Sequence, residues 1–240
     1  MTDAACRILE DTDWSGLEHA YGPACPETPT TLAGLVSGEP DAVRIALNHL
    51  SDELIHQTTL FSATVPAALY VAALVSDPEC RESVTPGWET GRYPLRAKLL
   101  DWLEAIAYEI SDSKVEVYRS WGFSEAEALL LYPGVRQIRP TLFPYVVNCL
   151  DDPDLRVRRA AVRAAVRLAD CSDLASHREL LAPLVRDVLV VSAEEEHRRL
   201  AINTLEAWGE DVEPLRSSVT PIPPAVPERA PEGPFDEPPF

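Results

Sequence analysis

The stretch "TLFPYVVNCLDDPDLRVRRAAVRAAVRLA", residues 141–169, decides the fold. Its apolar side chains recur every three to four residues on both sides of a short acidic turn, which is the spacing of two amphipathic helices. Asp152 is placed to cap the second helix, and Pro153 suits the first helical position, where its missing N–H needs no partner. The stretch therefore predicts a helix, a tight turn and a second helix.

A second stretch, "ELLAPLVRDVLVVSAEEEHRRLAINTLEAWG" at residues 179–209, repeats this plan. Here Ser192 and Glu195 form the S-x-x-E pattern of a capping box at the start of the second helix. The two stretches also share a proline inside the first helix, and Pro144 and Pro183 lie 39 residues apart. That separation is close to the period of stacked helix pairs.

Helical patterns continue through most of the remaining chain, while alternating strand patterns are nearly absent. The character changes near residue 213, where a segment dense in proline begins that cannot bury a core. We therefore expect an N-terminal capping segment over residues 1–30, a helical repeat domain over 31–212, and a disordered proline-rich tail over 213–240.

The helix pair around Pro144 resembles a HEAT repeat. The family's proline, its inter-helix aspartate and its Val-Arg pair fall here on Pro144, on Asp152 and Asp154, and on Val157 with Arg158. The resemblance implies an all-α fold: a right-handed α-solenoid of about four to five HEAT-like helix pairs, with a disordered Pro-rich C-terminal tail.

A narrower resemblance covers residues 45–75. There the segment His-Gln-Thr-Thr, residues 56–59, is followed by Ala-Thr-x-Pro, residues 63–66, and by an apolar helix. This order is similar to a group of bacterial HEAT-repeat proteins, and similar proteins occur as immunity proteins beside secreted toxins. The resemblance implies a role in binding and neutralising a toxin.

The formal net charge of −18 restricts the classes of partner. A surface this negative repels phosphate backbones and anionic lipids, so we expect no nucleic acid and no membrane among the partners. It speeds the encounter with a basic protein when the charge is focused on one face. The simpler alternative is that the acidity only keeps the protein soluble.

The N-terminus and the cysteines indicate the compartment. The first residues are acidic and lack a basic-then-apolar signal sequence, so we expect a cytoplasmic protein. The five cysteines are widely spaced, which favours reduced core thiols over a disulfide framework or a zinc site. We expect no metal and no cofactor.

The segment "LIHQTTLFSATVPAAL", residues 54–69, has the most concentrated set of polar side chains. A nucleophile-and-base site would need His56 near Ser62 or Thr64, with Asp52 as the orienting carboxylate. We favour a turn between helices, in which Ser62 or Thr64 caps the next helix and His56 bonds loop backbone.

A metal site is the second possibility for this region. His49, either Asp52 or Glu53, and His56 are spaced to align on one continuous helix, as metal ligands would be. Ser51 and Asp52 instead indicate a break with a new helix cap, so we expect no ligand role.

The second helix of the 141–169 stretch carries a basic stripe at helical spacing, opposite its apolar face: Arg156, Arg159, Arg163 and Arg167. The HEAT resemblance implies that this helix lines a concave face, so the last three are candidates for gripping a partner. The alternative, which we favour, is internal pairing with Glu194, Glu195 and Glu206 of the next unit.

The loop "SDPECRESVTPGWETGRY", residues 76–93, is the other candidate for contact with a partner. Long insertions in repeat proteins project from one face, and Trp and Arg are favoured interface anchors. The alternative is that Trp88 folds back over the helix ends. The candidate contact residues are Trp88, Glu89, Arg92 and Tyr93 of this loop, with Arg159, Arg163, Arg167, Glu194 and Glu195 of the later helices.

These patterns predict a non-enzymatic protein-binding module that occludes another protein, with a basic toxin domain as the specific candidate. One alternative is a scaffold or adaptor whose proline-rich tail recruits a different protein. A third hypothesis, an enzyme of HEAT-like fold, has little support because phosphate-loop, dinucleotide-loop, H-E-x-x-H and C-x-x-C patterns do not occur.

Overall fold

The computed structural model describes residues 3–77, 80, 84–85, 93–129 and 132–216. The described chain is mostly helical, which agrees with the expected all-α class. Trp88, Glu89 and Arg92 lie outside the described residues, and so does all of the expected tail beyond residue 216.

The N-terminal part alternates short helices with two-residue strands. In chain order its elements are α1 (Asp3–Asp11), the 3-10 turn η1 (Trp14–Gly16), β1 (Glu18–His19), β2 (Gly22–Pro23), α2 (Glu27–Ala33), the 3-10 turn η2 (Gly34–Val36), α3 (Pro40–His49), the π-helical turn η3 (Leu50–Leu54), β3 (Ile55–His56), β4 (Thr59–Leu60) and α4 (Thr64–Val75). β1 pairs antiparallel with β2, and β3 pairs antiparallel with β4.

The remainder contains the longest helices. Its elements are β5 (Val84–Thr85), β6 (Tyr93–Pro94), α6 (Leu95–Glu109), α7 (Asp112–Ser120), α8 (Glu125–Leu129), α9 (Pro133–Gln137), α10 (Arg139–Val147), α11 (Leu155–Leu168), the 3-10 turn η4 (Ala175–His177), α12 (Arg178–Leu184), the π-helical turn η5 (Val185–Val190), α13 (Glu195–Ala207) and α14 (Glu213–Arg216). β5 pairs antiparallel with β6.

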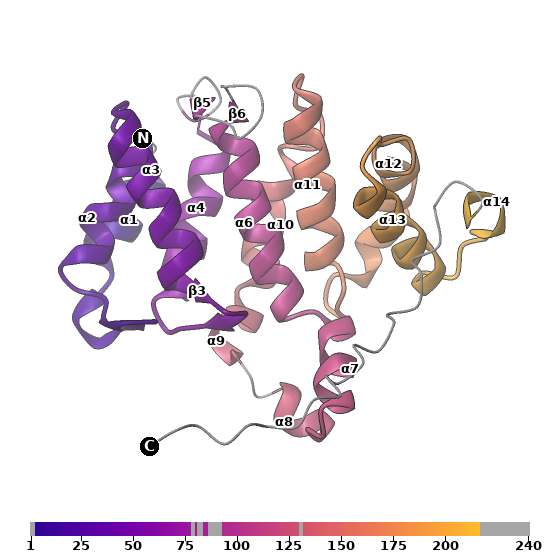
Figure 1. Ribbon diagram of the computed structural model, residues 1–240, viewed down its shortest axis with the longest axis horizontal. Coiled ribbons are helices and arrows are strands. Elements are labelled where there is room, and N and C mark those ends of the chain that lie inside the picture. The colour runs from indigo at the N-terminus through magenta and orange to yellow at the C-terminus, as the bar shows by residue number, and fades with distance from the viewer. Residues whose placement is uncertain (1–2, 78–79, 81–83, 86–92, 130–131, 217–240) are drawn as a thin grey trace, which may run out of the picture.

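Helix α6 is the centre of the molecule. It packs against α4 on one side and along most of α11 on the other, while α10 contacts both α4 and α11. The helices follow one another across the molecule, from α1–α4 at one end to α12 and α13 at the other, and α7 and α8 extend below the row (Figure 1).

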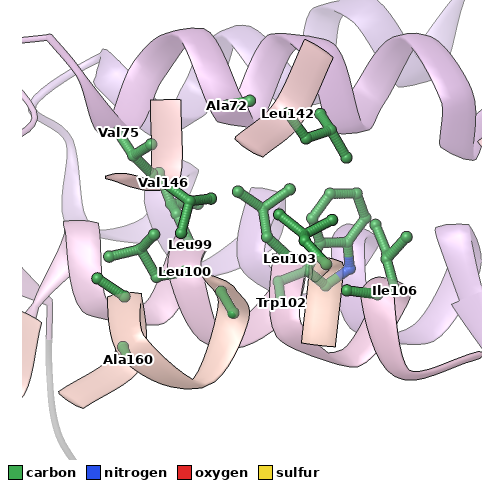
Figure 2. Packing of buried hydrophobic residues seen from close by; sticks show 14 of the residues in the cluster. Ala72, Val75, Leu99, Leu100, Trp102, Leu103, Ile106, Leu142, Val146 and Ala160 are labelled. Atoms are coloured by element: carbon green, nitrogen blue, oxygen red, sulfur yellow. The ribbon is translucent and has the colours of Figure 1, made fainter. Parts of the chain in front are cut away.

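The core forms where α4, α6, α10 and α11 meet (Figure 2). Side chains of α6 face those of the neighbouring helices: Leu99, Leu100, Leu103 and Ile106 from α6, Ala72 and Val75 from α4, Leu142 and Val146 from α10, and Ala160 from α11. Burying one leucine side chain completely stabilises the folded state by about 2 kcal/mol relative to leaving it exposed. The indole N–H of Trp102 donates to the carbonyl of Leu50 at 2.7 Å, which ties α6 to η3.

Two expected helix caps are wrong in detail. Asp154, not Asp152, caps α11 by accepting a hydrogen bond from the N–H of Arg156 at 2.8 Å. Asp152 instead points inward and pairs with Arg96 of α6. Ser192 makes no capping box with Glu195, because its hydroxyl hydrogen-bonds with Nδ1 of His197 and accepts a hydrogen bond from the N–H of Glu194.

The cysteines only partly fit the expectation of core thiols. Cys80, Cys149 and Cys171 are buried, whereas Cys25 is exposed. Within the described residues, none of the helices is both long enough and apolar enough to cross a membrane.

Candidate functional site

A groove between α6, α11 and α13 contains two of the candidate residues, Arg163 and Arg167, and encloses a cavity of about 220 Å³. We call it the charged groove. Its charged lining comes from Glu104 of α6, Arg163 and Arg167 of α11, Asp170 after α11, and Glu196, His197 and Arg199 of α13.

Arg163 is the most connected side chain in the charged groove. Its Nη2 lies 3.4 Å from a carboxylate oxygen of Asp101 and 3.4 Å from one of Glu104. Its Nη1 lies 2.9 Å from Nε2 of His197, so one guanidinium joins α6 to α13.

Arg167 occupies the next turn of the same helix face. Its Nε lies 3.2 Å from Glu104, and its guanidinium carbon lies 4.6 Å from the centre of the Tyr108 ring. Arg163 and Arg167 of the stripe therefore pair internally, as expected, but with α6 and not with Glu194, Glu195 and Glu206. α6 and α11 pack along their length, which places carboxylates three residues apart opposite arginines four residues apart.

The glutamates expected to pair with the stripe have other partners. Glu195 pairs with Arg199 on its own helix, Glu206 pairs with Arg216 of α14, and Glu194 lies 3.3 Å from Nε2 of His197. Arg159 is half-buried, and its Nε makes no hydrogen bond within the described part of the chain.

Burial sets the protonation states in the groove. It raises the pKa of Asp101 to about 6, an effect that the nearby charge of Arg163 only partly offsets. Burial also lowers the pKa of His197, and the positive charge of Arg163 lowers it further. Burial alone would lower the pKa of Arg163, but Asp101 and Glu104 together raise it.

A neutral His197 explains the hydrogen bonds around it. Its unprotonated Nε2 accepts from Arg163, and its Nδ1–H donates to the hydroxyl of Ser192 at 2.9 Å. Ser192 and His197 are both buried, and the Ser192 hydroxyl also accepts from the N–H of Glu194. A nucleophile must be reachable by substrate, so this serine–histidine contact serves the fold.

Tyr93 lies in β6, just before α6. The Lys98 ammonium and the Arg156 guanidinium approach its ring at 4.9 and 5.5 Å from the centre. Burial raises the pKa of its phenol. Tyr93 is the one candidate of the 76–93 loop that falls within the described residues, and it lies beside α6 and α11.

The turn expected over residues 54–69 is confirmed. β3 and β4 form a hairpin, and Nδ1 of His56 lies 2.9 Å from the carbonyl oxygen of Asp52. The hydroxyl of Ser62 accepts from the N–H of Glu18 at 2.8 Å, and that of Thr64 donates to the carbonyl of Leu54 at 2.6 Å. The expected cap is wrong, because Thr64 is already the first residue of α4.

The expected helix break at Ser51 is also wrong, since η3 continues α3 as a π-helical turn. Glu53 lies 3.0 Å from Nδ1 of His49, and also 3.4 Å from Nδ1 of His19, which sequence reasoning missed. His56 points elsewhere, with its ring against that of Tyr21. Among the residues that the structure describes, no three His, Cys, Asp or Glu side chains are grouped to hold a metal ion.

A second cavity, of about 650 Å³, lies between η1, β4, α4 and α9. Its lining is mostly apolar and includes Leu17, Phe61, Pro66, Tyr132 and Pro133.

Sequence reasoning also missed the hairpin of α7 and α8, where Trp121 and Phe123 are exposed. The signal was present in "SWGFSEAEAL", residues 120–129, where two aromatic residues flank a glycine ahead of an S-x-x-E capping box.

Neither a family model, nor a curated protein sequence, nor a solved structure matched the chain in comparisons with known proteins.

Proposed function

We propose that the helices form an α-solenoid of HEAT-like pairs. Contacts between α4 and α6, between α10 and α11, and between η5 and α13 support the pairing, and the contacts α6–α11 and α11–α13 support a continuous row of second helices. Pro144 lies inside α10 and Pro183 inside α12, the first helices of two successive pairs. The handedness and the number of repeats in this proposal come from the HEAT resemblance.

The function that we propose is recognition of another protein without chemistry, most specifically inhibition of a basic toxin domain by an immunity protein. The observation that carries it is the pairing of the basic stripe. Arg163 and Arg167 pair with carboxylates of α6 and Arg156 pairs with Asp154, so three of the five arginines of α11 form ion pairs within the fold. The net charge of −18 then acts as an attraction for a basic surface.

The charged groove fits this role better than it fits catalysis. A carboxyl with a pKa of about 6 beside a neutral imidazole is a pattern found in acid–base sites. Here both groups contact the same guanidinium, which holds them in ion pairs and hydrogen bonds within the fold. An enzyme of HEAT-like fold, the third hypothesis, would need one of them to leave that guanidinium and act on a substrate.

The test begins with affinity capture of the tagged full chain at low salt, followed by mass spectrometry. We expect one stoichiometric basic protein, whose expression alone slows cell growth and whose co-expression with this chain does not. Raising the salt from about 50 to about 300 mM should weaken binding, because exposed charges are screened over a shorter distance. A captured protein that is harmless alone, or binding that does not depend on salt, would count against this function.

The second candidate is a scaffold or adaptor, and the composition of the C-terminal segment favours it. Residues 217–240 contain "TPIPPAVPERAP", which resembles a proline-rich ligand of aromatic-lined grooves. Truncation after Arg216 keeps α14 and its ion pair with Glu206. An inhibitor should protect cells equally well without residues 217–240, whereas an adaptor should lose one of its two partners.

A further inference from the structure

Two aromatic side chains at the junction of α7 and α8 are exposed although the backbone around them is fixed. Trp121 is 62% exposed and Phe123 is 42% exposed. We call these two residues the aromatic tip. The hairpin that carries them extends away from the row of helices (Figure 1). Exposed apolar side chains that gather at one place mark interaction sites in soluble proteins.

The backbone of the junction is held by two helix caps in succession. Gly122, at a φ of +98°, ends α7, and the N–H of Phe123 donates back to the carbonyl of Tyr118 at 3.2 Å. This is a Schellman motif, which needs glycine at that position. Ser124 and Glu127 then form a reciprocal capping box that starts α8. The chain between the helices therefore has little freedom.

A buried polar network supports the tip from below. The Lys114 ammonium lies 3.1 Å from the Glu109 carboxylate, and the Tyr118 hydroxyl donates to the same carboxylate at 3.2 Å. The Tyr118 ring meets Trp121 edge-on at 5.6 Å and Phe123 at 5.8 Å between ring centres. Aromatic side chains that are oriented before binding lose less conformational entropy when a partner covers them.

The charge around the tip indicates the kind of partner. Glu116, Glu125 and Glu127 are exposed on α7 and α8, and the nearby Arg119 is already paired with Glu116 at 2.8 Å. Two copies of the tip would bring like charges together, which disfavours self-association. An apolar pocket rimmed by Lys or Arg complements both the aromatic rings and the carboxylates.

We infer that the aromatic tip is the anchor of the interface with a basic partner protein, inserting Trp121 and Phe123 into an apolar pocket while Glu125 meets the cationic rim. This inference rests on the proposed function, because it assumes that the partner is a basic protein. It places the contact on α7 and α8, and not on the 76–93 loop and the later helices, where sequence reasoning placed the candidate contact residues.

The experiment uses a photoreactive side chain as its probe. p-Benzoyl-phenylalanine replaces Trp121 in the full chain, or replaces Tyr21, which is 69% exposed in the turn between β1 and β2. After irradiation in cells, we expect a crosslinked basic protein from position 121 and not from position 21. A crosslinked dimer of the chain itself from position 121 would overturn the inference.

The crosslinked protein is then purified and titrated with purified variants. We expect Trp121→Ala to weaken binding by at least about tenfold, as for an interface hot spot, and Tyr21→Ala to change it by less than about twofold. Glu125→Lys leaves the aromatic residues in place and should also weaken binding, with a smaller dependence on salt. It serves as the second test should Trp121→Ala disturb the hairpin.

The outcomes separate the two proposals. A basic partner that binds Trp121→Ala and Glu125→Lys as tightly as the unmodified chain overturns the tip and leaves the proposed function standing. Capture of no basic protein, either by crosslinking or by affinity purification at low salt, overturns both.

Discussion

Nη1 of Arg96 lies 2.8 Å from Oδ2 of Asp152, and both side chains are buried. The same guanidinium donates to the carbonyl of Asp77 at 2.9 Å, just after α4. The second carboxylate oxygen of Asp152 accepts from the N–H of Asp154 at 3.0 Å. One ion pair thus joins the end of α4, the start of α6 and the turn before α11.

Removing one partner of this pair should be costly. Asp152→Ala leaves the Arg96 charge buried without its carboxylate, and we expect a loss of about 3–5 kcal/mol in the free energy of unfolding. Urea denaturation followed by circular dichroism measures it. Arg44→Ala is the matched control, because its pair with Asp41 is exposed and should contribute less than about 1 kcal/mol.

Replacing both partners should cost less than removing one. Arg96→Met combined with Asp152→Leu removes both charges and keeps apolar volume, so most of the loss should be recovered. If Asp152→Ala and Arg44→Ala destabilise equally, the pair does not hold the three elements together.

The hairpin between β3 and β4 stores strain. Gln57 and Thr58 have positive φ values of 47° and 66°, which residues other than glycine rarely adopt. We expect Thr58→Gly to raise the free energy of unfolding by about 0.5–1 kcal/mol, measured by urea denaturation.

Ala105→Gly in α6 is the control for the effect of glycine itself, and should lower the free energy of unfolding by about 1 kcal/mol. A destabilising Thr58→Gly would mean that the hairpin gains more from the threonine side chain than it loses in strain.

The features that the sequence predicted well are local ones. The helices of residues 141–169, the prolines inside α10 and α12, and the turn at residues 54–69 depend on spacing within about ten residues, where helix and turn preferences act directly. The internal pairing of Arg163 and Arg167 was also expected, although the partners named for them were wrong.

The features that it missed depend on packing between distant segments. Asp152 looked like a cap because Arg96, its actual partner, is 56 residues earlier in the chain. Glu104 likewise meets Arg167 across 63 residues. His19 reaches Glu53 only because the β1–β2 hairpin folds against η3. No local pattern encodes which helix lies beside which.

Asp101 should make the protein less stable as the pH rises. Its pKa is about 6 in the folded chain and 3.8 as an ordinary carboxyl, so the folded state holds the proton more tightly. The stability that protonated Asp101 contributes is therefore complete below pH 4 and is lost as the pH rises through about 6. Asp101→Asn keeps the neutral form at every pH.

The difference in unfolding free energy between Asp101→Asn and the unmodified chain should shift in favour of the variant by about 1–2 kcal/mol from pH 4 to pH 8. Urea denaturation across that range measures it. A constant difference would show that Asp101 titrates equally in the folded and unfolded chains.

His197 should act in the opposite direction. Because its pKa is lowered from 6.5 in the folded chain, the unfolded chain binds a proton first as the pH falls. Its contribution to stability is complete above pH 6.5 and is lost as the pH falls through that value towards the folded pKa. Protonation would also end the hydrogen bond that Nε2 accepts from Arg163.

The measurement uses the Asp101→Asn background, which removes the opposing titration of that carboxyl. There we expect the unfolding free energy to fall from pH 7 to pH 5, and His197→Gln to remove that fall, since glutamine does not titrate.

The charges facing His197 come from Arg159 and Arg163 of α11 and from Glu194 and Glu196 beside it. NMR titration of the His197 ring gives an independent reading: a pKa above 6.5 would mean that the glutamates outweigh burial and the arginines, and that the ring is charged at the junction of α11 and α13.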